Sequence, residues 1–144
     1  MLCGCGYATF RDIHVKLSPP AETQIGNLLG PSERREIDEV LQITDAVFRR
    51  HRLDWLSRPV KPNTLKLEPS FVVRDCAPSV SPWRDFHCQV FLDCPQQRIE
   101  IYMREQRSPG GGPGEFEALY SELLTNLEER FDNARITVRK HVIF

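Results

Sequence analysis

The chain has 144 residues, of which 40% are hydrophobic and 27% charged, and its formal net charge is −1. This is the composition of one ordinary globular domain with room for a hydrophobic core, and it excludes a disordered chain. The near-neutral charge provides no positive field to attract a polyanion, so we expect no nucleic-acid partner. No apolar run is long enough to cross a bilayer as a helix.

The N-terminal part of the chain carries mixed signals. From Tyr7 to Leu17 apolar and polar residues only partly alternate, which makes this stretch a candidate for an additional strand. Prolines and glycines between residues 19 and 30 then interrupt any long element. We therefore predict a tether and loop over residues 1–30 and a single domain over residues 31–144.

Two segments have the apolar period of an amphipathic helix. The first begins near Pro31 and ends near Leu53, and the second begins at Glu115 and ends at Asp132. In each, apolar residues recur three and four positions apart on one face, as expected for helices that lie on a core. These residues are Ile37, Val40, Leu41, Val47 and Phe48 in the first helix, and Phe116, Leu119, Tyr120, Leu123, Leu127 and Phe131 in the second.

Four segments have the alternation or β-branched content of strands. They are a short run at residues 71–73, residues 86–93 and 97–104, and the C-terminal residues 135–144. The middle two predict an antiparallel hairpin whose apolar face meets the helices. That face consists of Phe86, Cys88, Val90, Leu92, Ile99, Ile101 and Met103. In the last segment the apolar pattern changes face near Lys140, which indicates a β-bulge.

The elements follow one another in the order α-β-β-β-α-β, with the candidate strand at the N-terminus in addition. Each element has a single apolar face to cover. The sequence therefore predicts an α+β fold, a two-layer sandwich in which a mostly antiparallel sheet of about four strands packs against two amphipathic helices.

The histidines give no sign of a metal site. His14, His51, His87 and His141 are scattered, and no two have the spacing of a helical metal pair. His87 and Cys88 are adjacent on a predicted strand, so their side chains point to opposite faces and cannot act as a nucleophile and its base. The sequence thus identifies no catalytic residue, no metal ligand and no cofactor.

The glycine-rich segment from Gly110 to Gly114 directly precedes the second helix. Helix N-termini bind phosphate groups, but this segment lacks the Walker lysine and the dinucleotide spacing. We therefore favour the interpretation that this segment is a loop that binds no ligand. The alternative is a small soluble, cytoplasmic enzyme or anion-binding domain in which Gly110–Gly114 acts together with Arg104 and Arg107.

Charge is unevenly distributed along the chain. Residues 49–66 contain six basic residues and one acid, whereas residues 115–132 contain six acids and one basic residue. One interpretation is that these charges cap helices and solvate exposed faces. The other is an electrically two-sided molecule with a basic docking surface for an acidic partner or anionic head group, anchored by a loop tryptophan. The candidate partner-binding residues are Arg49, Arg50, Arg52, Trp55, Arg58 and Lys61.

Three cysteines lie around the predicted sheet. In an oxidising compartment we expect Cys76 to bond to Cys88 or Cys94, since Cys88 and Cys94 are too far apart along one extended run to bridge each other. The antiparallel return of the chain favours Cys88. In a reducing cytosol these cysteines are small buried hydrophobic residues.

At the N-terminus, Leu2-Cys3-Gly4-Cys5 resembles a bacterial lipobox over these four residues. The resemblance implies an envelope lipoprotein that is acylated at Cys5 and faces the periplasm; without lipidation the chain would be cytoplasmic. The leading hypothesis is a non-enzymatic accessory or protein-interaction domain that binds another protein through its sheet edge or its basic surface.

Overall fold

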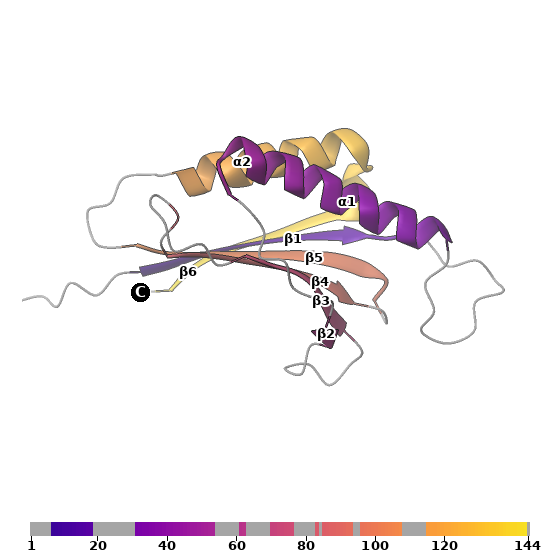
Figure 1. The fold of residues 1–144 in the computed structure, drawn as a ribbon, viewed down its shortest axis with the longest axis horizontal. Coiled ribbons are helices and arrows are strands. Elements are labelled where there is room, and N and C mark those ends of the chain that lie inside the picture. The colour runs from indigo at the N-terminus through magenta and orange to yellow at the C-terminus, as the bar shows by residue number, and fades with distance from the viewer. Residues whose placement is uncertain are drawn as a thin grey trace, which may run out of the picture.

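In the computed structural model of the chain, two helices pack on one sheet, and their apolar faces form a single core between them. This confirms the α+β two-layer fold (Figure 1). Both helices lie over the same face of the sheet. The structure describes residues 7–18, 31–53, 61–62, 70–76, 83, 85–93, 96–107 and 115–143.

The helices are α1 (Pro31–Arg50) and α2 (Glu115–Arg130), and a short 3-10 helix, η1 (Asn133–Arg135), follows α2. The strands are β1 (Tyr7–Lys16), β2 (Lys61–Pro62), β3 (Ser70–Cys76), β4 (Phe86–Asp93), β5 (Arg98–Arg107) and β6 (Ile136–Ile143). They form one sheet in the order β2-β3-β4-β5-β1-β6, in which every neighbouring pair is antiparallel.

The candidate strand near the N-terminus is confirmed as β1, which lies inside the sheet between β5 and β6. A tether over residues 1–30 is therefore wrong for residues 7–16; residues 1–6 and 19–30 lie outside the described part of the chain. The alternation of apolar and polar residues in β1 is interrupted because the charged Arg11 occupies a position that faces the helices. Its guanidinium pairs with Glu117 of α2 and lies 5.6 Å from the ring centroid of Tyr120.

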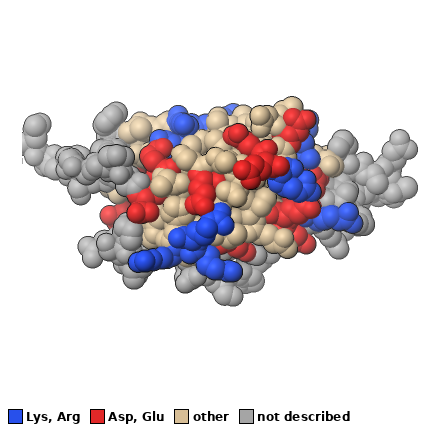
Figure 2. All heavy atoms as spheres, turned by 90° about the horizontal axis from the view of Figure 1, so that it is seen from above, with Lys and Arg blue, Asp and Glu red and all other residues tan. Residues whose placement is uncertain are grey.

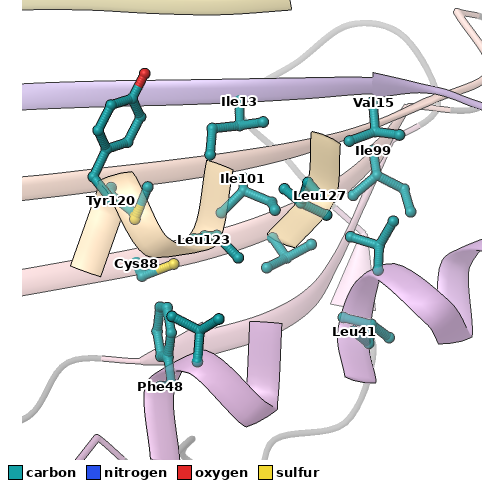
Figure 3. Packing of buried hydrophobic residues seen from close by; sticks show 14 of the residues in the cluster. Ile13, Val15, Leu41, Phe48, Cys88, Ile99, Ile101, Tyr120, Leu123 and Leu127 are labelled. Atoms are coloured by element: carbon teal, nitrogen blue, oxygen red, sulfur yellow. The ribbon is translucent and has the colours of Figure 1, made fainter. Parts of the chain in front are cut away.

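The hairpin of β4 and β5 forms as predicted and has the predicted buried face. Val90 pairs with Ile101 and Leu92 with Ile99, and the apolar members of both strands are buried. Figure 3 shows Cys88, Ile99 and Ile101 of this face on the side of the sheet that packs against the helices. Ile13, Val15, Ile99 and Ile101 from the sheet lie opposite Leu123 and Leu127 of α2 and Leu41 and Phe48 of α1.

The sheet differs from the prediction in two details. It has six strands, since β1 and the two-residue β2 join the predicted ones. The bulge expected near Lys140 is wrong, because β6 pairs with β1 without interruption; the register shift lies in β3, between Val72 and Arg74. The face change in β6 has another cause. Val138 is 40% exposed, so the helices cover this edge strand only in part and it does not need a continuous apolar face.

Helix α1 ends in a Schellman motif that the sequence did not indicate. The N–H of Leu53 donates to the carbonyl of Phe48 (2.8 Å), and the N–H of Arg52 donates to the carbonyl of Arg49 (3.1 Å). Both Leu53 and Phe48 are buried, which supplies the apolar contact of the motif. Arg52 has φ of 62°, a left-handed conformation that usually belongs to glycine at this position.

Replacing Arg52 with glycine should remove this backbone strain. We expect Arg52→Gly to raise the free energy of unfolding by about 0.5–1 kcal/mol in denaturant titrations, because the left-handed penalty exceeds the extra entropy of a glycine in the unfolded chain. Arg49→Gly, inside the last turn of α1, is the matched control and should lower it by about 1 kcal/mol. A lower stability of Arg52→Gly would contradict the assignment of the cap.

Candidate functional site

The two faces of the sheet differ in chemistry because successive strand residues point to opposite sides. The face away from the helices, here called the polar face, carries most of the charged and aromatic side chains that the structure describes in the strands. Its central strands contribute Phe10, Asp12, His14 and Lys16 from β1, and Arg98, Glu100, Tyr102 and Arg104 from β5. Strand β4 adds His87, Gln89, Phe91 and Asp93, and β6 adds Thr137, Arg139 and His141.

Three potential metal ligands meet on the polar face. His14 of β1 is directly opposite Glu100 of β5, and Asp12 lies two residues before His14 on the same side. Their ligand atoms all lie within 4.8 Å of one another, and His14 Nε2 is 3.7 Å from Glu100 Oε1. Only 8% of the His14 side chain and 14% of the Glu100 side chain are exposed. One imidazole and two carboxylates thus converge in a largely buried position.

A basic pocket adjoins this group. It has a volume of about 250 Å³, and His14 forms part of its wall. Four cationic side chains line it together with two polar ones: Lys16, Arg98, Arg135 and Arg139, with Gln96 and Thr137. The pocket therefore has the chemistry of an anion site, at the end of β1 where β5 and β6 flank it.

Arg135 is held in this pocket by a buried carboxylate of α1. Glu36 Oε2 pairs with Arg135, and Glu36 Oε1 accepts the backbone N–H of Ser18 at 2.8 Å. Arg135 Nε also donates to the carbonyl of Lys16 (2.8 Å). Burial raises the pKa of Glu36, but the hydrogen bonds from Arg135 and Ser18 outweigh it and hold this pKa below its ordinary value. The ionised carboxylate therefore ties α1 to the ends of β1 and η1.

The lowered pKa of Glu36 makes stability depend on pH. Its ionised form stabilises the fold above the unfolded-state pKa of about 4.3, and this contribution is lost as the pH falls through the lower folded-state pKa. Glu36→Gln should reduce the free energy of unfolding at neutral pH by about 1–3 kcal/mol. Denaturant titrations should also show that its stability falls less between pH 5 and acid than that of the wild type.

The control for this prediction is Glu39→Gln, also on α1. Glu39 pairs with Arg130, whose side chain is 50% exposed. Loss of this ion pair should lower the free energy of unfolding by only about 0–1 kcal/mol. Equal acid dependence of the wild type and Glu36→Gln would contradict the role assigned to Glu36.

The basic segment expected to bind a partner is partly neutralised within the chain. Arg50 Nε donates to Glu122 Oε1 at 2.5 Å, and His51 Nε2 is 2.5 Å from Glu122 Oε2. Burial raises the pKa of Glu122, but these hydrogen bonds outweigh it and lower the pKa. Helices α1 and α2 lie side by side, and Figure 2 shows their acidic and basic side chains intermixed, so Arg50 is already paired within the chain; the two-sided charge of the whole molecule stays a prediction.

The remaining partner-binding candidates are only partly described. Arg49 and Arg52 are exposed. Trp55 and Arg58 lie outside the described residues, and Lys61 is placed in β2 without a described side chain. Whether these residues bind a partner stays a prediction.

Cys76 and Cys88 are neighbours across two strands, as the preferred pairing predicts, and the described residues form no disulfide. Cys76 of β3 is the register partner of Cys88 of β4, and Cys88 is buried. No disulfide is at bonding distance in the described part of the chain, and Cys94 lies outside it. Directly opposed residues on antiparallel strands have Cα separations that suit a disulfide, so the preferred pairing fits the backbone register.

Two other candidate sites fall on undescribed residues. The loop from Gly110 to Gly114 is one and the lipidation site Cys5 is the other. Arg104 is exposed on the polar face of β5, and Arg107 ends that strand. Anion binding by the glycine loop and acylation of Cys5 both stay predictions.

The sequence missed the convergence of Asp12, His14 and Glu100. A histidine pair on a helix is visible as a local spacing, whereas these ligands come from two strands far apart in the sequence. The sequence pattern that could have indicated part of this cluster is Asp-x-His in β1, because it places both side chains on one face of a strand. The pattern has this meaning only because Tyr7–Lys16 is a strand.

Comparisons with known proteins give no family. No protein-family model and no curated protein match the chain. Among solved structures, it is similar to an amidase of the hydantoinase/carbamoylase family from Burkholderia phymatum, with 12% identity and a TM-score of 0.34. The match covers 96% of this chain and 27% of the amidase chain. At this level of similarity the activity of the amidase is not transferred to this chain.

Proposed function

We propose that the chain is a non-enzymatic protein-interaction domain that pairs the outer edge of β6 with an extended segment of another protein. The observation that supports this is the position of β6, which ends the strand order with no described strand on its outer side. Val138 and Val142, at 40% and 43% exposure, are the exposed large hydrophobic side chains among the described residues. An edge strand with exposed apolar side chains is a template for strand addition.

The side chains of β6 define the chemistry of the partner. On the helix side, the exposed Lys140 lies between Val138 and Val142, and on the polar side Arg139 lies beside His141. A strand added here would place its residues directly opposite these. The complementary segment therefore has apolar residues opposite the valines and acidic residues opposite Lys140 and Arg139.

A second copy of this chain fits the edge less well. If two β6 strands paired antiparallel so that Val138 met Val142, Lys140 would lie opposite Lys140 and Arg139 opposite His141. Like charges directly opposite each other destabilise a strand pair. Basic residues on an edge strand are also a common protection against self-association. Both effects favour an acidic partner over a symmetric dimer.

The proposed interface can be tested with a synthetic extended peptide in which valines flank glutamates. We expect Lys140→Glu to weaken its binding at least tenfold and to slow association, with a difference that shrinks as salt is added. The measurement is surface plasmon resonance at two salt concentrations. Arg104→Glu, an exposed charge reversal on the polar face of β5, is the matched control and should bind like the wild type. Equal affinities of wild type and Lys140→Glu would contradict the proposal.

The predicted lipid anchor would place this domain at a membrane surface. None of the helices that the structure describes is long and apolar enough to cross a membrane. Strand β1 begins at Tyr7, two residues after Cys5, so an acylated Cys5 would leave almost no tether between lipid and sheet. Several acyl chains on one cysteine would bind far more strongly than a single chain.

Lipidation is tested by expressing the complete gene in its own host. The wild-type protein should appear in the detergent-soluble membrane fraction, and Cys5→Ser should release it. Cys3→Ala, which leaves the lipidated position intact, should stay with the membrane. A wild-type protein recovered without acylation would exclude the anchor and leave the edge-binding proposal unaffected.

A further inference from the structure

We propose that Asp12, His14 and Glu100 bind one divalent transition-metal cation, with an open coordination position directed at the adjoining basic pocket. The site lies on the polar face of the sheet, whereas the proposed protein interface is the outer edge of β6. It would supply a second binding function, for a small anionic oxygen ligand such as a phosphate or carboxylate group.

The geometry of the three side chains is close to that of a metal site. Zinc holds nitrogen and oxygen ligands at about 2.0–2.2 Å, which places neighbouring ligand atoms roughly 3.4 Å apart in a tetrahedron. His14 Nε2 is already 3.7 Å from Glu100 Oε1, and all three ligand atoms lie within 4.8 Å. The proposal requires the carboxylate side chains to rotate and close the remaining distance to the metal.

The ligands also stand on a rigid part of the fold. Asp12 and His14 belong to β1, which pairs with β5 and β6 over nearly its full length, and Glu100 belongs to β5, which pairs with β1 and β4. Ligands on regular, doubly paired strands keep their relative positions better than ligands on loops.

The donor set selects the type of metal. One imidazole with two carboxylates suits Zn²⁺, Mn²⁺, Fe²⁺ or Co²⁺, because calcium and magnesium prefer sites made of oxygen ligands alone. Three protein ligands leave at least one position for water or for a bound molecule, as in metal sites that act on a substrate.

The surroundings favour a cation at this point and an anion beside it. Asp12 and Glu100 bring two carboxylates together where little of the Glu100 side chain is exposed, and a divalent cation would offset their repulsion. His14 is shared between the cluster and the basic pocket, so a ligand bound to the metal on that side would lie near Lys16, Arg98 and Arg139. An anionic ligand there would contact both the metal and these cationic side chains.

A purely structural role makes a different prediction. In that case a protonated His14 pairs with Glu100 as an internal ion pair, and the protein needs no metal. The two cases are separated by titrating the metal-free protein with Zn²⁺ and with Mn²⁺ in a calorimeter. We expect one equivalent to bind, and His14→Gln and Glu100→Gln each to weaken binding at least tenfold.

His87→Gln is the matched control, because His87 also lies on the polar face beside a carboxylate, with its Nε2 3.2 Å from Asp75 Oδ1. This variant should bind metal like the wild type. Absence of one-equivalent binding in the wild type, or equal binding by His14→Gln, would overturn the proposal.

Two measurements on the wild type avoid any dependence on variant folding. In NMR spectra, Zn²⁺ should shift the ring signals of His14 and leave those of His87 in place; the reverse pattern would overturn the site. With Co²⁺ bound, addition of inorganic phosphate should change the visible absorption of the metal. A spectrum that phosphate leaves unchanged would contradict the open position facing the pocket.

Discussion

Strand β1 is hydrogen-bonded on both sides, to β5 and to β6, so each of its side chains is committed to one face of the sheet. Ile13 and Val15 point into the core under the helices and are fully buried, while Asp12 and His14 point to the polar face. A slip of one residue would exchange these two sets and place charged groups in the core. The core and the metal-ligand cluster are therefore fixed by the same register.

The double pairing of β1 also determines which edge of the sheet is available. Because β1 joins β5 to β6, the C-terminal strand becomes the last in the order of the described sheet, where the helices cover it only in part. Val138 and Val142 are exposed for this reason, although their positions alternate like those of a buried strand. The proposed interface follows from the size of the helix layer relative to the sheet.

Most of the fold could be predicted from local periods, but the site could not. The helices and the β4–β5 hairpin have clear apolar patterns, so their positions and buried residues were predicted, although both helices end two or three residues earlier than expected and β5 continues to Arg107. Arg11 broke the pattern of β1 because its charge is neutralised by Glu117, a contact across 106 positions of sequence that no local pattern contains. The meeting of His14 with Glu100, and the pairing of Arg50 with Glu122, likewise depend on strand order and helix packing, which are properties of the tertiary fold.

Amide hydrogen exchange measured by NMR tests the central claim, that β1 is an interior strand and β6 an open edge. Antiparallel strands use alternate residues to bond each neighbour, so an edge strand leaves about half of its amides unbonded. We expect the amides of β1 to exchange only with global unfolding, whereas every second amide of β6 should exchange orders of magnitude faster. Uniformly slow exchange along β6 would show that its edge is already covered, and fast exchange along β1 would contradict its place in the sheet.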